Sequence, residues 1–563
     1  MLSALEIARR AELRPIEEIA GQMGIGRHLL EHYGEHVAKI KLEAIDELAD
    51  RPRARYVVVS AVSPTPFGEG KTTMTIGLGQ AMGLLGKRAT VAIRQGSMGP
   101  TFGIKGAAAG GGYSQAVPFE IMALHLTGDM HAVTEANNML SALLDNEIYQ
   151  GNELGIDVHD ITWRRVLDVD DRALRNVIIG LGGRIDGIPR QTGFDITAAS
   201  EAMAILALSS SLADMRARLG RIIVGYTRAG EPVTAEQLRG AGAMTVIMRE
   251  ALKPNLVQSL ENTPVLVHTG PFGNIAHGSS SIVADLIAVH CGDYLFTEAG
   301  FGADMGAERF FNIKCRTSGL EPDAGVVVTT VRALKVQSGK YRVVTGRPLP
   351  EALFAENVDD VQAGAPNLAK QVDIVRCHGV TPVVAINVQP GDFPSEHEAI
   401  REIAASLGVR VAVCRPFTDG GKGAVELAEA VAEATEEPSR FQLLYPSEMT
   451  LREKIETIAE KIYGAAGVDY SPTAARQLAR YETHGLGNLP ICVAKTQYSL
   501  SADPVLYGAP TGWRLPVREV RASVGAGFIY PICGDMSTMP GLSSSPSAYE
   551  IDINDAGEIV GLS

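Results

Sequence analysis

The sequence predicts an α/β protein: a P-loop-type, mostly parallel sheet flanked by helices, with additional α/β lobes around a central crevice. Three observations favour this class. Apolar runs typical of buried strands, such as Val57–Val59, alternate with helical patterns from Tyr56 onward. A strand, a loop ending in Gly-Lys-Thr and an apolar helix follow one another within residues 57–85. The chain has 563 residues, 45% of them apolar, enough for a large core.

Residues 1–54 read as polar helices that end at Arg51-Pro52-Arg53. His28, His32 and His36 would share one helix face there, and a solvated face is favoured over a metal site because no carboxylate or cysteine cluster accompanies them. Further strands are expected at Ala89–Arg94, Asn176–Gly180, Val265–His268, Tyr294–Thr297, Val326–Thr330, Val383–Asn387 and Val409–Cys414, with helices at Ile196–Leu208, Ala235–Leu252 and Ala424–Ala434.

This pattern predicts three domains. Residues 1–330 would form the N-terminal P-loop domain for a nucleotide, residues 331–440 a second α/β domain, and residues 441–563 a C-terminal lobe closing on the rest.

Composition narrows the possible partners and compartment. The chain carries 51 Lys and Arg against 65 Asp and Glu, a net charge of -14, and no basic stripe, which argues against a nucleic-acid partner. No apolar run approaches membrane-spanning length, and the N-terminus lacks a signal-peptide core. The six cysteines show no zinc spacing, so we expect reduced thiols in a cytoplasmic protein.

The segment from residue 65 to residue 73 is the most informative motif. In such a loop the backbone N–H groups converge on anionic oxygens, and the following helix adds partial positive charge. Lys71 would reach the β- and γ-phosphates, and Thr72 could offer its hydroxyl to Mg²⁺. An ordinary glycine-rich turn is the alternative, because Thr65 stands where the first glycine belongs. The candidate ATP-binding residues here are Thr65, Pro66, Phe67, Gly68, Glu69, Gly70, Lys71, Thr72 and Thr73.

Arg94 ends the second expected strand, at the edge where Lys71 also points. A guanidinium there can clamp phosphate or carboxylate oxygens, although a surface ion pair is the alternative. The glycine-rich run Gly103–Tyr113 follows, and it reads as a loop that grips a ligand with its backbone or as a flexible linker.

Three further segments follow expected strands or precede a helix. Asp129 reads as a helix N-cap or as an acceptor for a substrate amine or pterin edge. The small-residue loops His268–Gly278 and Thr297–Asp304 would face the same crevice as the phosphate loop.

Taken together, these segments closely resemble the formate–tetrahydrofolate ligase family over nearly the whole chain. The resemblance rests on several blocks in order, which are far more specific than the phosphate loop alone. They are Thr65–Thr73, Gly99–Tyr113, Leu126–His131, His268–Gly278, Thr297–Asp304 and Leu489–Ser499.

The resemblance implies ATP-dependent ligation of formate to tetrahydrofolate, which gives 10-formyltetrahydrofolate, ADP and phosphate through formyl phosphate. It further implies use of Mg²⁺, activation by a monovalent cation (K⁺ or NH₄⁺) and a homotetramer. Carried over by residue, it makes Lys71 and Arg94 catalytic, with Phe301 and Gly302 beside the nucleotide. Asp129, Phe393 and Phe417 would contact folate.

Two departures from the family's pattern concern these residues. Phe417 stands where the family often has Trp, and Gln95-Gly96 replaces a pair usually written Glu-Pro or Gln-Pro. An ungapped match would put Gln389 on the second stacking position, and Phe393 takes that role only if the loop is shifted.

Two other readings stay open at this point. A P-loop ligase of the dethiobiotin-synthetase kind would use ATP without folate. A nucleotide switch of the partitioning-ATPase kind would dimerise without making a product, and it would favour a shorter chain with a second lysine early in the loop, where this sequence has Pro66, Phe67 and Glu69.

Overall fold

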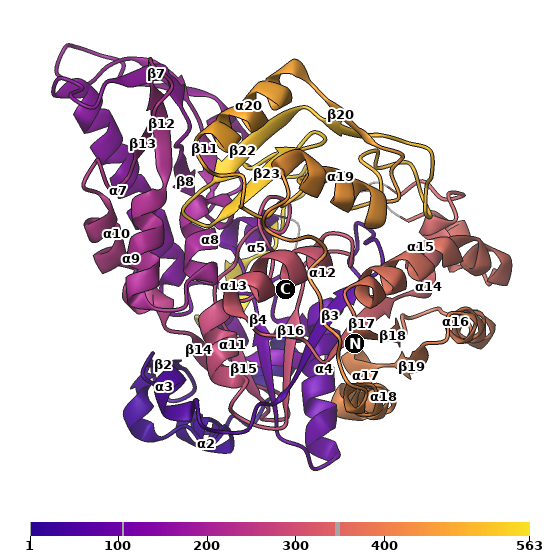
Figure 1. Ribbon diagram of the computed structural model, residues 1–563. Coiled ribbons are helices and arrows are strands. Elements are labelled where there is room, and N and C mark those ends of the chain that lie inside the picture. Colours follow the sequence, from indigo (N-terminus) through magenta and orange to yellow (C-terminus); the bar gives the residue numbers. More distant parts are fainter. Residues whose placement is uncertain (1, 104–105, 344–348, 563) are drawn as a thin grey trace.

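A twelve-stranded sheet forms the centre of the molecule, as seen in the computed structural model, which describes residues 2–103, 106–343 and 349–562 (Figure 1). Its main path runs, in spatial order, through β1 (Leu30–His32), β2 (Ala38–Ile40), β14 (Asn255–Ser259), β15 (Pro264–Val267), β4 (Ala89–Ile93), β16 (Tyr294–Glu298), β3 (Arg55–Ala61), β17 (Ala324–Thr329), β18 (Thr381–Asn387) and β19 (Arg410–Cys414). Off this path, β6 (Ser114–Val117) pairs with β14, and β5 (Gly110–Gly111) pairs with β6.

The seven strands on the path from β15 to β19 are parallel to one another, so their carboxyl ends share one edge of the sheet. The α/β class with a mostly parallel sheet is therefore confirmed. Of the strands expected from the sequence, those near residues 57, 89, 265, 294, 326, 383 and 409 all lie in this sheet.

Helices cover both faces of the sheet because its central strands are apolar on both sides. In β3, Tyr56 and Val58 belong to one core cluster, and Val57, Val59 and Ala61 belong to the other. One face packs against α4 (Lys71–Leu84), α6 (Phe119–Ala123) and α18 (Val425–Glu436). The opposite cluster contains residues of α7 (Asp129–Tyr149), α8 (Glu201–Leu208), α10 (Ala241–Met248), α11 (Ile282–Ala288), α14 (Val331–Gln337), α15 (Val358–Cys377) and α16 (Pro394–Ser406).

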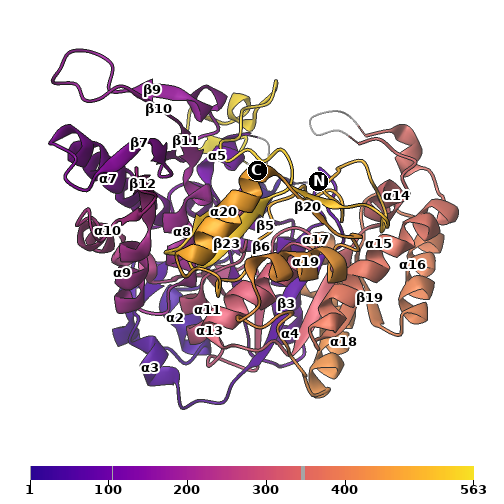
Figure 2. The ribbon, with the colours of Figure 1, turned by 45° about the horizontal axis from the view of Figure 1, so that its top comes forward.

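Two smaller lobes lie outside the sheet, beyond α8 and above the carboxyl edge (Figures 1 and 2). The first contains β7 (Ile156–Ile161), β8 (Arg165–Leu167), β9 (Val177–Ile179), β10 (Arg190–Thr192), β11 (Phe194–Ile196), β12 (Ile223–Thr227), β13 (Pro232–Thr234) and α9 (Leu212–Arg221). The second contains α19 (Leu451–Lys461), β20 (Val468–Tyr470), α20 (Pro472–Thr483), β21 (Leu515–Val517), β22 (Glu519–Ser523) and β23 (Phe528–Ile532).

The remaining elements are short. They are α1 (Ala4–Arg9), α2 (Ile16–Gln22), α3 (Ala44–Leu48), α5 (Met98–Gly103), α12 (Gly306–Arg309), α13 (Arg316–Ser318), α17 (Pro416–Asp419), β24 (Asp552–Ile553) and β25 (Ile559–Val560). Since β17, β18 and β19 continue the sheet that contains β3, residues on both sides of position 330 share one sheet, and the division into three domains stays a prediction.

One expectation about local structure was wrong, and two are confirmed only in part. The expected strand Asn176–Gly180 lies outside the central sheet, because β9 pairs antiparallel with β10 through a glycine-rich turn, and Ile178 is 60% exposed. The helix expected over Ala235–Leu252 is reduced to α10 and a short 3₁₀ turn. Residues 1–54 include β1 and β2 as well as short helices, so His28, His32 and His36 do not share a helix face.

Among the described residues, no helix is long and apolar enough to cross a lipid bilayer. All six cysteines are free thiols, and all but Cys377 are buried.

Candidate active site

The phosphate loop connects β3 to α4 at the carboxyl edge of the sheet. Gly70 ends the loop with φ of 75°, in the left-handed region. A Cβ atom at this position would also lie 2.4 Å from Asn387 Nδ2. Glycine is therefore required both by the backbone conformation and by the close approach of β18.

Glu69 shapes this loop from inside. One carboxylate oxygen accepts hydrogen bonds from the Thr65 backbone N–H (2.8 Å) and hydroxyl (2.9 Å), and the other accepts one from the Thr330 hydroxyl (2.7 Å). Asn387 Nδ2 donates to the Glu69 carbonyl at 2.9 Å. Glu69 is 2% exposed, so it fixes the loop against β17 and β18, while Phe67 is 48% exposed at the loop surface.

Lys71 and Thr72 are the first two residues of α4. The Thr72 hydroxyl donates to Glu298 Oε2 at 2.7 Å, and Glu298 is the last residue of β16. Thr73 is buried beneath them. The helix start thus brings a lysine and a hydroxyl to the same edge as a carboxylate.

Arg94 directly follows β4 and lies on the other side of Glu298. Its Nε is 3.9 Å from Glu298 Oε1, and its side chain is 30% exposed. One terminal nitrogen donates to the Pro271 carbonyl at 3.4 Å, and both terminal nitrogens lie 3.6 Å from the position a Cβ would take at Gly300. Thr72 and Arg94, far apart in sequence, therefore share one carboxylate.

Glu298 was not predicted as a functional residue. The sequence shows that it lies within the segment Thr297–Asp304, but its position between the phosphate loop and Arg94 depends on the strand order β4–β16–β3. The identifiable signal was an acidic side chain at the carboxyl end of an apolar strand.

The loop after Glu298 runs beside the start of the phosphate loop. Ala303 N–H donates to the Ala61 carbonyl at 2.9 Å, and a Cβ at Gly302 would lie 3.2 Å from the Val62 carbonyl oxygen. Phe301 has φ of 64°, and its ring lies against Gly273, where a Cβ would come within 2.9 Å of Phe301 Cε2. The structure thus places Gly302 beside the end of β3, where the chain enters the phosphate loop, and the Phe301 ring against the loop His268–Gly278.

Two buried cations anchor the C-terminal lobe to these loops. Lys495 Nζ pairs with Asp304 at 2.8 Å, and both side chains are fully buried. Arg309 donates to the carbonyls of Gly273, Ala276 (3.0 Å) and Val493. The conformation of the crevice loops therefore depends on the segment Leu489–Ser499.

The histidines of the loop His268–Gly278 add no charge to the site. Burial lowers the pKa of His268 to about 4 and holds the pKa of His277 well below its usual value. Both imidazoles are neutral at pH 7, so Lys71 and Arg94 supply the positive charge at this edge.

Phe417 lies in α17, which follows β19, and contacts the hairpin of β5 and β6. A Cβ at Gly111 would lie 3.1 Å from its ring, and one at Gly112 would lie 2.0 Å from its carbonyl oxygen. This contact accounts for the glycines at the end of the run Gly103–Tyr113, whose residues Ile104 and Lys105 lie outside the described part. The Phe417 side chain is 41% exposed.

The segment after β18 contains both residues considered for the second aromatic position. Val388 N–H still pairs with the Cys414 carbonyl (3.0 Å), so Gln389 stands directly at the strand end. Its amide oxygen accepts a hydrogen bond from Arg332 at 2.6 Å. Phe393 lies after the Pro390-Gly391 turn and directly before α16, and it is half-buried.

Asp129 forms a buried ion pair beside the start of β14. Its carboxylate is 2% exposed, pairs with the buried Lys39 at 2.8 Å and accepts a hydrogen bond from Asn255 Nδ2 at 2.7 Å. Gly128, not Asp129, is the N-cap residue of α7. Contact between Asp129 and a folate would require this buried pair to open.

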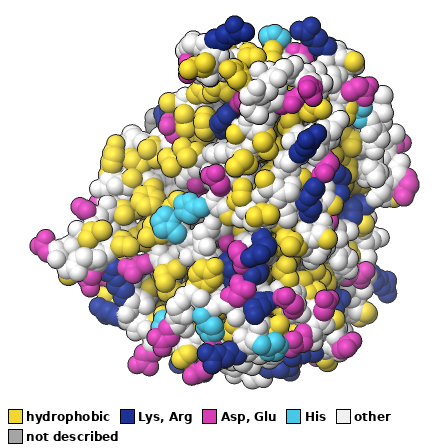
Figure 3. Space-filling view, turned by 90° about the vertical axis from the view of Figure 1, so that its left-hand side faces the viewer, with side chains coloured by type: hydrophobic (Ala, Val, Ile, Leu, Met, Phe, Trp, Pro, Cys, Tyr) yellow, Lys and Arg dark blue, Asp and Glu magenta, His cyan; other side chains and the backbone are white. Residues whose placement is uncertain are grey.

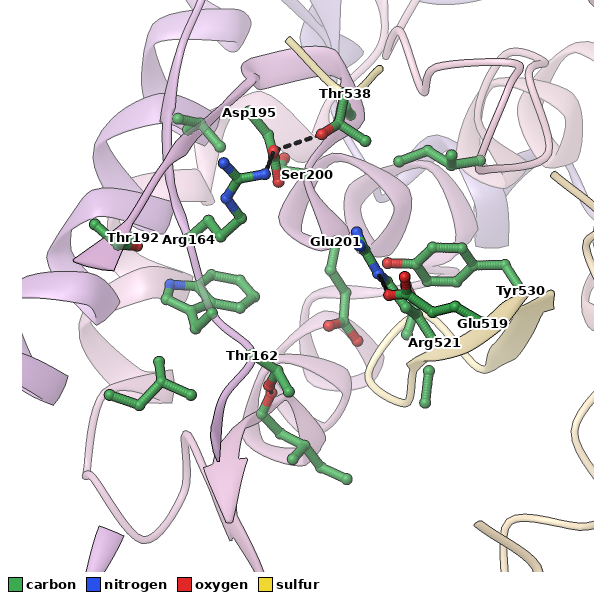
Figure 4. Close-up of a pocket in the computed structure, with 18 of the residues that line it drawn as sticks. Thr162, Arg164, Thr192, Asp195, Ser200, Glu201, Glu519, Arg521, Tyr530 and Thr538 are labelled. Atoms are coloured by element: carbon green, nitrogen blue, oxygen red, sulfur yellow. Dashed lines mark hydrogen bonds and ion pairs between the residues drawn. The ribbon is translucent and has the colours of Figure 1, made fainter. Parts of the chain in front are cut away.

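A separate cavity of about 1030 Å³ lies between the two smaller lobes (Figure 4). Its charged groups are largely paired within the wall: Arg164 with Asp195 at 2.8 Å, and Arg521 with Glu519. Glu201, at the start of α8, accepts hydrogen bonds from the Gly525 and Ala526 N–H groups at 2.7 and 3.3 Å. We interpret this cavity as a polar junction that joins the lobes.

Glu201 makes stability at this junction dependent on pH. Burial raises the pKa of its carboxyl from the ordinary 4.5 to about 7. The folded protein therefore binds this proton more tightly than the unfolded chain does. The stabilisation that the bound proton supplies is complete below about pH 4.5 and is lost as the pH rises through about 7. Glu201→Gln is therefore expected to raise Tm by about 2 °C or more at pH 8 and to change it little at pH 5, measured by scanning calorimetry.

The control for this measurement is Glu236→Gln. The Glu236 carboxylate is exposed and paired with Arg216, and the hydrogen bond from Arg216 lowers the pKa of Glu236. It should not raise Tm at either pH. An equal gain for Glu201→Gln at pH 5 and pH 8 would contradict the assignment of the raised pKa.

Comparison with known proteins identifies relatives along the whole chain. A family model described as Formate–tetrahydrofolate ligase matches residues 2–563. The chain is 70% identical over 561 residues to the Formate–tetrahydrofolate ligase of Saccharopolyspora erythraea, covering 100% of this chain and 99% of the relative. It is 65% identical over 573 residues to Formate–tetrahydrofolate ligase 3 of Rubrobacter xylanophilus and 58% identical over 562 residues to the Formate–tetrahydrofolate ligase of Cutibacterium acnes, with 100% of each chain covered in both cases.

Proposed function

The chain belongs to the formate–tetrahydrofolate ligase family, and from this we propose that it joins formate to tetrahydrofolate in an ATP-dependent reaction that gives 10-formyltetrahydrofolate, ADP and phosphate. The observation that carries the proposal is the carboxylate of Glu298, which lies between the Thr72 hydroxyl and the Arg94 guanidinium. Transfer of phosphate to a small acid requires a loop that binds the nucleotide phosphates and a second cation nearby, and both lie at the same edge of the sheet here.

In the first step, a formate oxygen attacks the γ-phosphorus of ATP, the bond to the β-phosphate oxygen breaks, and ADP leaves. Negative charge spreads over the equatorial oxygens of the transferring group. Lys71 and the backbone N–H groups at the start of α4 stabilise this charge from one side and Arg94 from the other. The product of this step is formyl phosphate.

In the second step, N10 of tetrahydrofolate attacks the formyl carbon, and the carbon–oxygen bond to phosphate breaks. Phosphate leaves with the oxygen that came from formate, and the N10 proton passes to water. Arg94 stabilises the departing phosphate, since its guanidinium carries donors suited to phosphate oxygens.

The residues at the start of α4 fit a magnesium ion. Mg²⁺ prefers oxygen ligands and is commonly bound through one or two carboxylates together with substrate phosphates. The Thr72 hydroxyl and the Glu298 carboxylate supply such oxygens 2.7 Å apart. The metal would neutralise charge on the nucleotide phosphates.

A monovalent cation fits the segment after β4. Gln95 Oε1 and the Thr269 hydroxyl oxygen are buried without a hydrogen-bond partner among the described residues, and Gln95 N–H donates to the Thr269 carbonyl at 2.7 Å. These neutral oxygens would hold K⁺ or NH₄⁺ next to Arg94 and so position its side chain.

We propose that the pterin ring stacks on Phe417, with the second face supplied by the segment Gln389–Phe393. Phe417→Ala is expected to raise the KM for tetrahydrofolate about tenfold or more, because stacking on an aromatic ring contributes about 1–3 kcal/mol. Initial rates at saturating ATP and formate measure this effect, and Phe417→Trp should retain a KM close to the wild-type value.

The matched control for stacking is Phe354→Ala, another aromatic side chain that is 44% exposed. An unchanged KM for tetrahydrofolate in Phe417→Ala would place the pterin elsewhere. Comparing Phe393→Ala with Gln389→Ala then shows which of these two side chains contacts the second face.

The reaction itself is tested by the dependence of ADP release on both co-substrates. With Mg²⁺ and K⁺ present, ADP should form only when formate and tetrahydrofolate are both supplied. ADP formation without folate would favour an acid-activating ligase of another kind, and equal hydrolysis without either would favour a nucleotide switch.

We further propose that the protein is a homotetramer in a reducing compartment, the cytoplasm. Apolar side chains gather on the face that contains the lobe of β7 and α9 (Figure 3). The loop of β9 and β10 exposes Leu181 (66%) and Ile185 (85%), more than an isolated surface residue requires. The free thiols support the compartment.

The double substitution Leu181→Asp with Ile185→Asp is expected to reduce the mass of the assembly below four chains, because two buried charges would oppose association. Light scattering after gel filtration measures the mass. Ile553→Asp, at a side chain 65% exposed on β24, is the control and should leave it unchanged. A four-chain mass in the double variant would exclude this hairpin from the interface.

A further inference from the structure

A cleft of about 360 Å³ lies at the edge of the sheet opposite the active site. It is lined by Arg55 and Tyr294, which begin β3 and β16, and by the turns that precede the three adjacent strands β3, β4 and β16. The phosphate loop, Arg94 and Glu298 all lie at the carboxyl ends of the same strands. The cleft is therefore separate from the catalytic crevice.

The lining is strongly cationic, although the whole chain has a net charge of -14. Five positive side chains face it, and the carboxylates beside them are those of Asp293 and Asp323. The five are Arg51, Arg53, Arg55, Lys87 and Arg88. Gathering like charges is unfavourable unless a counter-ion offsets their repulsion.

The two carboxylates already bond to the backbone. Asp293 Oδ2 accepts a hydrogen bond from Arg88 N–H at 2.8 Å, and Asp323 Oδ2 accepts one from Tyr56 N–H at 2.7 Å. Their contacts with the guanidinium groups of Arg55 and Arg88 are longer, at 3.4 and 3.9 Å. Most donors of these guanidinium groups therefore remain available to a ligand.

Two of the cations have no carboxylate partner in the described part of the chain. Arg51 donates to the carbonyls of Met23 (3.4 Å) and Gly24 (3.0 Å), which orient its guanidinium without neutralising it. The Lys87 ammonium group makes no hydrogen bond or ion pair with the residues that the structure describes, and the backbone N–H of Lys87 donates to the Met82 carbonyl at 2.9 Å. A ligand in this cleft would supply the missing negative charge.

We propose that this cleft binds a compact ligand carrying two or more phosphate groups. Arginine groups bind phosphate oxygens through paired N–H donors, and arginines and a lysine from separate turns surround a volume suited to a short phosphate chain. Free pyrophosphate and the diphosphate of a nucleotide share this chemistry, and the experiment distinguishes them.

The test is equilibrium dialysis of the full-length protein with pyrophosphate at low ionic strength. The wild type should bind two molecules per chain, one at the phosphate loop and one in the cleft. Lys87→Gln with Arg88→Gln should retain the first and weaken the second at least tenfold. The control, Arg249→Gln with Arg514→Gln, removes two positive charges from exposed positions elsewhere and should bind as the wild type does.

Turnover of the Lys87→Gln, Arg88→Gln protein should stay within about twofold of the wild type, which shows that it folds and that its active site is intact. The same dialysis with ADP assigns the source. If the wild type binds two molecules of ADP and the cleft variant binds one, the ligand is a nucleotide. If the wild type and the variants all bind one molecule of ADP, the ligand is free pyrophosphate.

Two results would overturn the proposal. One is a single pyrophosphate site in the wild type. The other is a second site that survives unchanged in the cleft variant. If the wild type binds a single pyrophosphate and the Lys87→Gln, Arg88→Gln variant also forms a smaller assembly, the cations instead bind an acidic surface of a second copy of this chain.

Discussion

Replacing Arg94 by alanine is expected to lower kcat about 100-fold or more, while the KM for tetrahydrofolate changes little. The guanidinium lies beside Glu298 at the mouth of the sheet and is oriented by the Pro271 carbonyl. In the mechanism that we propose, it acts on charge that develops on the transferring phosphate, so its loss would affect the transition state more than the bound substrates. Steady-state rates with each substrate varied in turn measure both parameters.

Arg514→Ala removes an equally long side chain, 50% exposed and paired with Asp469, and serves as the control. It should leave kcat within about twofold of the wild-type value. An effect of Arg94→Ala confined to the KM for tetrahydrofolate would show that Arg94 binds folate and does not stabilise the transferring group.

Replacing Glu298 by glutamine is expected to lower kcat/KM for ATP about 100-fold and to raise the Mg²⁺ concentration needed for half-maximal activity. The substitution keeps the shape of the side chain but removes the charge that Thr72 and Arg94 share. Titrating Mg²⁺ at fixed ATP in the wild type and the variant measures both effects.

Glu433→Gln is the matched control, because this carboxylate is 70% exposed and pairs with Arg410 on the surface. It should show the wild-type dependence on Mg²⁺. If Glu298→Gln melts at the wild-type temperature and keeps the same Mg²⁺ requirement, Glu298 is not a ligand and serves only to position Arg94.

Local sequence patterns predicted the parts of this protein that depend on neighbouring residues. The apolar run in β3, the glycine at position 70 and the stripe of α4 are contiguous, so the phosphate loop and its helix could be read directly. The strands that carry Arg94 and the segment Thr297–Asp304 were found for the same reason.

The rest depended on contacts between distant segments. Glu298 joins Thr72 to Arg94 only because β16 lies between β3 and β4, an order that no local pattern encodes. Asp129 was expected to face a ligand or cap a helix, but Lys39, ninety residues away, binds it in the core. The apolar residues near Ile178 resemble a sheet strand, and only the pairing with β10 shows that they form an exposed hairpin.

The central claim is that the cationic edge formed by Lys71 and Arg94 transfers phosphate to formate before folate attacks. Turnover of ¹⁸O-labelled formate with ATP and tetrahydrofolate tests it directly, with the released phosphate analysed by mass spectrometry. The account predicts that each phosphate carries one ¹⁸O from formate, because the carbon–oxygen bond of formyl phosphate breaks in the second step. Phosphate free of the label, with 10-formyltetrahydrofolate formed at the normal rate, would contradict it.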